Sequence, residues 1–321
     1  MKKYTYQSIL GPYIEGLLKE KRSNGYNYSK EELVLQRFDL YCTQKRLDTV
    51  HITKKFLSEW MMRSENEGPH NQNARICAVR QLCLFMASMG IDVYVPIRYC
   101  TSYKPMPHIF TREEIHNFFY VLDTAEPADR TFTKRLHQEY RLIFRMYCLC
   151  GLRNSEACGI LTENVNLQEG ILTILNAKGH KDRLVYMPDD LTDSCRKYYE
   201  WLCQTISCSP RYFFPASDVE KPIRNTLMAS VFNRIWENTK FAGCGNKPTI
   251  HDFRFTFVVS RMNSWTEEGR DLNVMMPYLS RYLGHKTTKE TLYYFFLVSD
   301  AYNTVRKKDT IASTVIPEAE I

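Results

Sequence analysis

The sequence predicts a mainly α-helical protein of two domains, the second of which also contains a small antiparallel sheet. Apolar residues recur at helical spacing up to about residue 95 and through most of the chain after residue 111. A stretch with three prolines and no sustained period separates these parts and indicates a linker. Two short apolar runs, at 171–175 and 183–187, predict a β-hairpin. The length of 321 residues also allows about two domains.

The first domain, residues 1–100, should begin with two amphipathic helices. Apolar residues at i, i+4 and i+8 from Ile9 to Leu18 predict the first helix, which should end near Asn24. Ser29 and Glu32 form a capping-box pattern for the second helix. Its apolar face is expected to contain Leu33, Phe38 and Tyr41.

Two further helices complete this expected bundle. Thr53 can cap the third, and Gly90 should end the fourth. The third helix carries Phe56, Leu57, Trp60 and Met61, and the fourth places Ile76, Val79, Leu82, Phe85 and Met86 on one face. We therefore expect a small helical bundle before the linker at 101–110.

The second domain, residues 111–321, should open with a helix that starts at Thr111, with Glu114 as its capping-box partner. Helical patterns continue through most of this domain and are interrupted by the two apolar runs of the hairpin. The turn between those runs is basic and reads AKGHKD at 177–182. We expect a mixed, mostly helical domain around this hairpin.

Composition excludes several classes of protein. The chain has 43 Lys and Arg against 36 Asp and Glu, 44% hydrophobic residues and 25% charged residues, which excludes a disordered or collagen-like chain. Residues 1–105 hold 16 basic and 10 acidic residues, so the first domain is the basic part and could bind phosphate backbones. The eleven cysteines are scattered and the histidines lack metal-ligand spacing, so we expect reduced, buried thiols, no metal and no cofactor. No apolar run could span a bilayer, and we expect a cytoplasmic, nucleoid-associated protein.

Four scattered segments carry residues suited to phosphate chemistry. Arg153 follows an apolar helix and could offer two parallel donors to a phosphate. His251 and Arg254 lie three residues apart on a predicted helix, so both side chains could reach one ligand. His285 follows a glycine and precedes a helix, and Lys178 in the hairpin turn could donate a proton to a leaving oxygen. Each residue alone is equally well explained as a structural or ion-paired side chain.

Taken in order, these segments resemble the tyrosine recombinase family, also called the phage integrase family. The motifs are GLRNSE at 151–156, AKGHKDR at 177–183, HDFRFTF at 251–257 and LGH at 283–285, followed nine residues after the histidine by Tyr294. The resemblance covers the chain from about residue 111 to its end. It implies the fold of the DNA breaking-rejoining enzymes, with the first domain as a core-binding domain.

The resemblance implies a catalytic set and a mechanism that the chemistry of these groups supports. The set is Arg153, Lys178, His251, Arg254, His285 and Tyr294. The two arginines would stabilise the non-bridging phosphate oxygens, and His251 would accept the proton of the attacking phenol. His285 would bind the phosphate, and Lys178 would protonate the departing 5′-oxygen. A 3′-phosphotyrosine would conserve the bond energy, so that the strands could rejoin without ATP, and the cluster of cationic side chains would remove the need for a metal.

Two departures from the family pattern and one ambiguity accompany this assignment. Phe253 and Phe255 replace a frequent leucine and a second histidine, and Ala177 replaces a frequent glycine; none of these is in the catalytic set. Tyr293 and Tyr294 are adjacent phenols, which point about 100° apart on a helix, so only one can face the site. The spacing from the histidine favours Tyr294, and Tyr293 is then a core or interface residue.

Three further residues have expected supporting roles. Glu156 is expected to orient an arginine without itself contacting the phosphate. Lys181 and Arg183 are most simply solvated, although in the family's hairpin such residues lie towards DNA. His251 and His285 could also be structural histidines when each is considered alone.

The resemblance also implies partners. We expect double-stranded DNA with paired inverted half-sites, bound by a two-domain clamp, and a homotetramer formed by exchange of the C-terminal tail, where Ile311, Val315 and Ile316 form a small apolar set. A frayed tail is the alternative. Because the sequence begins within the helical domain, we expect no separate arm-binding domain.

Integration or excision of a mobile element is the expected role, with accessory DNA-bending proteins as further partners. A type IB topoisomerase and a non-catalytic DNA-binding accessory protein are the alternatives.

Overall fold

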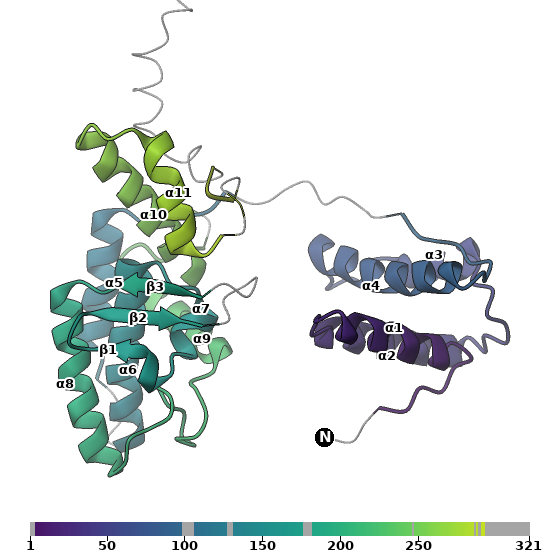
Figure 1. Cartoon of the computed structure of the whole chain (residues 1–321), viewed down its shortest axis with the longest axis horizontal. Coiled ribbons are helices and arrows are strands. Elements are labelled where there is room, and N and C mark those ends of the chain that lie inside the picture. Colours follow the sequence, from purple (N-terminus) through teal and green to yellow (C-terminus); the bar gives the residue numbers. More distant parts are fainter. Residues whose placement is uncertain are drawn as a thin grey trace, which may run out of the picture. The chain divides into compact units, whose positions relative to one another are not determined.

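The computed structural model describes residues 4–97, 106–126, 131–175, 182–245, 247–285, 287 and 290–292. The chain divides into two compact units between residues 105 and 106 (Figure 1). Within the described ranges, no helix is long and apolar enough to cross a bilayer.

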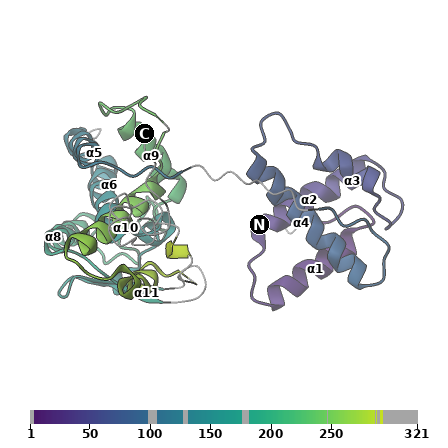
Figure 2. The ribbon, with the colours of Figure 1, turned by 90° about the horizontal axis from the view of Figure 1, so that it is seen from above.

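The first unit contains four helices, as the sequence predicts. They are α1 (Gly11–Ser23), α2 (Ser29–Gln44), α3 (Lys54–Met61) and α4 (Pro69–Ser88). The helix α4 contacts both α1 and α2 (Figure 2). Leu17, Phe38, Leu57 and Leu82 are fully or almost fully buried in one apolar cluster that all four helices share. Burial of this shared apolar face stabilises helices that would be marginal in isolation.

Helix starts in this unit agree only in part with the predictions. The Thr53 hydroxyl accepts a hydrogen bond from the Phe56 backbone N–H at 3.2 Å, which confirms the predicted cap of α3. The predicted capping box of α2 is wrong, because Ser29 already lies in the helix and its hydroxyl bonds to Asn27. Leu33, expected in the core, is 55% exposed. The buried face of α2 instead consists of Leu35, Phe38, Asp39 and Cys42.

The second unit is mostly helical around a small sheet. Its helices are α5 (Arg112–Thr124), α6 (Thr131–Cys150), α7 (Asn154–Cys158), α8 (Asp189–Ile206), α9 (Asn225–Trp236), α10 (Ile250–Glu267) and α11 (Leu272–Leu283), with a 3-10 turn at Thr162–Asn164. The predicted capping box at the start of α5 is confirmed: Thr111 and Glu114 exchange bonds of 2.7 and 3.2 Å.

The sheet has three antiparallel strands in the order β1 (Val165–Asn166), β2 (Ile171–Ile174) and β3 (Arg183–Tyr186). The strands β2 and β3 confirm the two predicted arms of the hairpin, whereas the sequence analysis missed β1, which is only two residues long. Leu172 pairs with Val185, and Ile174 pairs with Arg183. The turn at 176–181, which contains Lys178, lies outside the described residues.

Several helices pack together in the core of the second unit, and the residues of the candidate site lie near the ends of these helices. The helix α6 contacts α5, α7, α8 and α10. Phe118, Phe144, Phe232 and Phe253 form a buried aromatic group with ring centroids between 5.1 and 6.3 Å apart. Such edge-to-face and offset pairs add to the stabilisation from burial alone. The chain leaves this rigid core at Gly151, two residues before Arg153.

Replacing Gly151 with alanine should destabilise the second unit by about 2 to 4 kcal/mol. Gly151 has a φ of +62°, and an added Cβ would lie 2.5 Å from Cδ1 of the Phe257 ring. Gly243→Ala is the matched control, because Gly243 has a φ of +82° but nothing within 4 Å of the added carbon. Urea unfolding should show a clearly larger loss for Gly151→Ala. Equal losses would mean that the contact with Phe257 relaxes without cost.

The ten described cysteines are all free. The prediction of buried thiols holds for Cys42, Cys83, Cys150, Cys158 and Cys195. It is wrong for Cys208 and Cys244, which are exposed on loops. Burial raises the pKa of Cys195 to about 12, so this thiol stays protonated at neutral pH.

Candidate active site

Four of the six predicted catalytic residues lie together in the second unit. Arg254 Nη2 lies 3.4 Å from His285 Nε2, and Arg153 Nη2 donates to the backbone carbonyl of Gly284 at 3.3 Å. His251 precedes Arg254 by one turn at the start of α10, close enough for the charges of both arginines to act on it. Lys178 and Tyr294 lie outside the described residues, so their positions stay predictions.

Local structure explains how α10 presents two of these side chains. The helix is capped by Thr249, whose hydroxyl and backbone N–H both donate to the Asp252 carboxylate, at 2.9 and 2.6 Å. This cap fixes the first turn, where the His251 side chain remains exposed beside the Phe255 ring. One turn further, Arg254 points into the protein and is 1% exposed. The three-residue spacing therefore places an imidazole outside and a guanidinium inside.

Arg254 joins three separate segments of the second unit. Its Nη1 donates to the carbonyl of Gly151 at 2.6 Å, just after α6, and its Nη2 donates to the carbonyl of Leu283 at 2.6 Å, at the end of α11. Carbonyls at helix C-termini lack a partner within their own helix, so a buried guanidinium satisfies them well. This arrangement fixes Arg254 and also holds the segments that carry Arg153 and His285.

Arg153 is held by a carboxylate that also binds a second arginine. Glu156 accepts from Arg153 Nη1 at 2.7 Å and from Arg183 Nη2 at 2.7 Å. The expected supporting role of Glu156 therefore has a geometric basis. The expectation that Arg183 is solvated is wrong, because the residue is only 8% exposed. The alternation of β3 explains this result, since Arg183 and Val185 face inwards and Leu184 faces outwards.

The charge state of Glu156 follows from these contacts. Burial alone would raise the pKa of this carboxyl. The hydrogen bond and charge of Arg183, with the backbone N–H and side chain of Arg153, lower its pKa to about 2. Glu156 is thus ionised at every pH at which the protein would function.

Both histidines of the cluster are neutral at pH 7. Desolvation and then the positive charge of Arg254 lower the pKa of His285 to about 4, and the same two causes lower that of His251. His285 Nδ1 lies 2.7 Å from the Thr291 hydroxyl. Because a guanidinium can only donate, its contact with His285 Nε2 favours the tautomer with hydrogen on Nδ1. A neutral His251 is the form that can accept a proton.

The contribution of His285 to the free energy of unfolding should fall as the pH drops from about 6.5 towards about 4. Glu139, whose pKa burial raises to about 8, contributes in the opposite direction, so the effect of His285 is measured as a difference between wild type and a His285 variant. In the unfolded chain His285 takes up a proton near its ordinary value of 6.5, whereas in the folded protein it does so only near 4. The unfolded state therefore binds more protons in this window, and stability present above it is lost within it. Urea unfolding of wild type and His285→Asn at about pH 7 and about pH 5 measures the effect.

His285→Asn should lose less stability than wild type between these two pH values. His251 contributes in the same direction and remains in the variant, so part of the slope persists. The lowered pKa of Glu156 affects stability mainly near and below its ordinary value of 4.5, which lies below both measured pH values. An identical loss in both proteins would contradict the assignment of a neutral His285.

A cavity of about 650 Å³ opens beside Arg153. Its polar lining includes Ser155, Asn164 and Arg211, and its apolar lining includes Leu175. Arg211 cannot be recognised from the sequence, since an isolated arginine in a loop gives no periodic signal. This cavity places an additional cation on the same surface as the cluster, where it can contribute to binding an extended anion.

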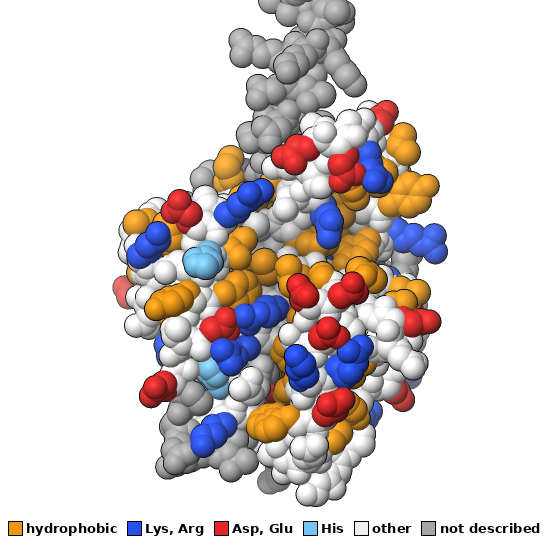
Figure 3. Space-filling model, turned by 90° about the vertical axis from the view of Figure 1, so that its left-hand side faces the viewer, with side chains coloured by type: hydrophobic (Ala, Val, Ile, Leu, Met, Phe, Trp, Pro, Cys, Tyr) orange, Lys and Arg blue, Asp and Glu red, His pale blue; other side chains and the backbone are white. Residues whose placement is uncertain are grey.

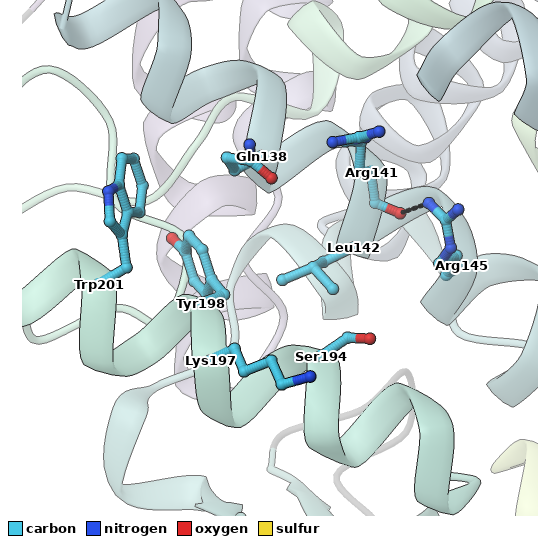
Figure 4. A pocket seen from close by; sticks show the side chains of 8 residues that line it. All are labelled: Gln138, Arg141, Leu142, Arg145, Ser194, Lys197, Tyr198 and Trp201. Carbon is cyan, nitrogen blue, oxygen red and sulfur yellow. Dashed lines mark hydrogen bonds between the residues drawn. The ribbon is translucent and has the colours of Figure 1, made fainter. Parts of the chain in front are cut away.

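A different pocket, of about 400 Å³, lies between α6 and α8 and contains none of the predicted catalytic residues (Figure 4). Its two arginines, Arg141 and Arg145, both bind the Asp123 carboxylate, at 2.9 and 2.6 Å. On the face in Figure 3, basic and acidic side chains are interspersed, with hydrophobic side chains between them.

Residues 111–297 match the sequence profile of the phage integrase family, which is more than half of the chain. The chain belongs to the phage integrase family. The match confirms the prediction of an enzyme of the tyrosine recombinase type, and it supports site-specific recombination as the activity. The four motifs from residue 151 to residue 285 all lie within the matched range.

Relatives of this phage integrase extend the match into the first unit. The putative integrase/recombinase y4rB of Sinorhizobium fredii is 24% identical over 302 residues, which cover 90% of this chain and 92% of y4rB. The tyrosine recombinase XerA of Pyrococcus furiosus is 28% identical over 193 residues, 60% of this chain and 58% of XerA. The longer alignment with y4rB therefore includes the helical bundle as well as the catalytic unit.

Solved structures confirm the predicted fold. The Tn1549 transposon integrase, in complex with transposon right end DNA, matches 92% of this chain and 98% of its own with a TM-score of 0.63 and 13% identity. The XerH site-specific recombinase, in a post-cleavage complex with a palindromic difH substrate, matches 82% of this chain and 74% of its own with a TM-score of 0.59 and 19% identity. At these identities the likeness is one of fold.

Proposed function

We propose that this phage integrase cleaves and rejoins double-stranded DNA through a 3′-phosphotyrosine formed by Tyr294. The observation that carries the proposal is the cluster of Arg153, Arg254 and His285, which lie on three separate segments. Arg153 donates to the carbonyl of Gly284, next to His285, and Arg254 Nη2 lies 3.4 Å from His285 Nε2. Two guanidinium groups suit a phosphodiester that gains charge as it is attacked, and the neutral imidazole of His251 can accept the proton of the attacking phenol. The Tn1549 integrase and XerH, which share the fold, were solved on DNA.

Each step of this mechanism has a proposed residue. The Tyr294 oxygen attacks phosphorus, the bond from phosphorus to the 5′-oxygen breaks, and the phenolic proton passes to His251. Lys178 gives a proton to the departing 5′-oxygen. Arg153 and Arg254 neutralise the non-bridging oxygens. The reverse reaction with another 5′-hydroxyl rejoins the strands, and no bond energy is lost, so ATP is not required. The two guanidinium groups supply the charge stabilisation that a metal ion would otherwise give.

Partners and biological role are proposed from the same resemblance. The first unit, residues 1–100, serves as a core-binding domain, since it carries the basic excess of the chain. It and the catalytic unit together bind paired inverted half-sites, and C-terminal tails exchanged between subunits hold a homotetramer on DNA. Integration or excision of a mobile element is supported by the likeness to y4rB and to the fold of the Tn1549 transposon integrase.

The test is covalent trapping on nicked duplexes. Fragments from the flanks of the chain's own gene are first selected by gel shift, then nicked near the bound centre and incubated with the protein in EDTA. We expect a protein–DNA adduct that resists SDS and disappears on protease treatment. A fragment bound with clear sequence preference that gives no adduct at any nick position would refute the proposal. Relaxation of supercoils without exchange of partners would favour the topoisomerase alternative.

A further inference from the structure

We infer that Arg183 is a positioning residue for cleavage, which acts through Glu156 on Arg153. The inference rests on the proposed function, because it assigns Arg153 to the scissile phosphate. Arg183 lies on β3, 30 residues after Arg153, and is the last residue of the AKGHKDR motif, for which the resemblance implies only a position towards DNA. Its guanidinium binds Glu156 in a two-pronged contact, with Nη1 to Oε1 at 3.0 Å and Nη2 to Oε2 at 2.7 Å.

Every hydrogen-bonding position of the Glu156 carboxylate is occupied. Besides the two bonds from Arg183, Oε1 accepts from Arg153 Nη1 at 2.7 Å and Oε2 accepts from the Arg153 backbone N–H at 2.9 Å. A carboxylate has about four lone-pair positions, so four donors saturate it. Glu156 therefore cannot rotate without breaking at least one strong bond, and Arg153 is fixed at both its backbone and its side chain.

Charge gives Arg183 a second effect on Arg153. Glu156 and Arg153 alone would form a neutral pair, which would weaken the attraction of Arg153 for a phosphate. With Arg183 present, the buried trio has two positive charges and one negative, so one net positive charge remains. The side chains of Arg183 and Glu156 are only 5% and 7% exposed, whereas that of Arg153 is 19% exposed. The uncompensated charge is thus available at the residue that faces outwards.

Arg183 also lies against the loop that presents His285. An added Cβ at Gly284, whose φ is +65°, would be 3.1 Å from Arg183 Nη1, so the two groups are in close contact. The Gly284 carbonyl accepts from Arg153 Nη2. Arg183 therefore supports Arg153 from two directions, through Glu156 and through this loop. Arg183 pairs with Ile174, the last paired residue of β2 before the segment that contains Lys178. A change at Arg183 could therefore slow cleavage by displacing Lys178 instead of Arg153.

The first experiment compares Arg183→Met and Arg183→Lys with wild type in single-turnover adduct formation on nicked DNA. Arg183→Met should slow cleavage about 10- to 100-fold, as expected for a misplaced catalytic group, with DNA affinity changed less than about threefold. Arg183→Lys should recover part of the rate, because it restores the charge without the fork. A rate for Arg183→Met within about twofold of wild type would overturn the inference.

Two further measurements identify the route. If Arg183 acts through Glu156, the double variant Arg183→Met with Glu156→Gln should be no slower than the slower single variant, whereas multiplying effects would contradict the route. A 5′-bridging phosphorothiolate substrate releases a thiolate that needs no proton. The Arg183→Met defect should persist on it, and its disappearance would assign the effect to Lys178 instead.

Arg135→Met is the matched structural control. Arg135 is 4% exposed and donates to the carbonyls of Pro215 and Ala216, away from the cluster. This variant should lose thermal stability but keep a cleavage rate within about twofold of wild type at a permissive temperature. An equal drop in rate for Arg135→Met would show that the Arg183 effect reflects general loss of structure.

Side-chain spectra of nitrogen-15-labelled arginine test the inference without cleavage. The Arg153 resonance, assigned through Arg153→Lys, should be sharp in wild type and should shift and broaden in Arg183→Met. An unchanged Arg153 resonance would overturn the inference even where wild type forms no adduct. Failure of the proposed function would instead appear as the absence of adduct from wild type.

Discussion

Tyr294→Phe is expected to form no covalent adduct with nicked DNA, while binding the same DNA with nearly the affinity of wild type. The substitution removes one oxygen, which is the nucleophile of the proposed reaction, and leaves the apolar ring in place. The guanidinium groups that we propose to bind phosphate are unaffected. Trapping in EDTA followed by SDS electrophoresis measures the adduct, and gel shift measures the affinity.

Tyr293→Phe is the control for this prediction, because the two phenols are adjacent in the sequence and would point about 100° apart on the helix that the sequence predicts. It should keep adduct formation. An adduct that persists in Tyr294→Phe and is lost in Tyr293→Phe would move the nucleophile by one residue. Retention of the adduct in both variants would place the nucleophile outside this segment.

Local rules predicted the elements of the fold where a short motif decides them. The box at Thr111 and the cap at Thr53 involve donors and acceptors within three residues of each other, so the sequence contains the whole interaction. The start of α2 was misjudged because Tyr28 adopts a left-handed conformation with a φ of 52°, which no propensity favours. That start puts Ser29 within the helix, so its hydroxyl cannot cap it.

The burial of charged side chains is the feature of the candidate site that the sequence did not predict. The motifs named Arg153, His251, Arg254 and His285, and the structure brings these four together. They did not reveal that Arg183 is buried, because the burial of a charge depends on a partner 27 residues away. Alternation along β3 was the available signal, since Arg183 shares the inward face with Val185. An arginine on the apolar face of a strand requires a buried carboxylate.

The candidate site is assembled from the ends of helices, and this explains its rigidity. Arg153 follows α6, His285 follows α11, and Arg254 joins the carbonyls at both ends. Helices that pack in one core fix these ends relative to each other, whereas loops alone would not. Preorganised donors lose no energy to reorientation when charge develops on the phosphate.

Arg153→Ala should slow adduct formation by about 100- to 1,000-fold, equivalent to about 3 kcal/mol or more of lost transition-state stabilisation. The variant should still fold, because Arg183 continues to donate to both oxygens of the Glu156 carboxylate and to compensate its charge. Single-turnover trapping gives the rate, and urea unfolding gives the stability. Arg196→Ala, which removes an exposed ion pair with Asp193, is the control and should change neither.

Arg254→Ala should show the same kinetic loss and, unlike Arg153→Ala, a large loss of stability. It leaves the carbonyls of Gly151 and Leu283 without their buried donor, and each unsatisfied acceptor costs about 1 to 3 kcal/mol. Arg254→Lys keeps a charge but cannot reach both carbonyls as a fork, so it should be intermediate in stability and still slow in cleavage. Wild-type cleavage rates in Arg153→Ala and Arg254→Lys would refute the phosphate-clamp role. A stable Arg254→Ala would contradict its role in joining the ends of α6 and α11.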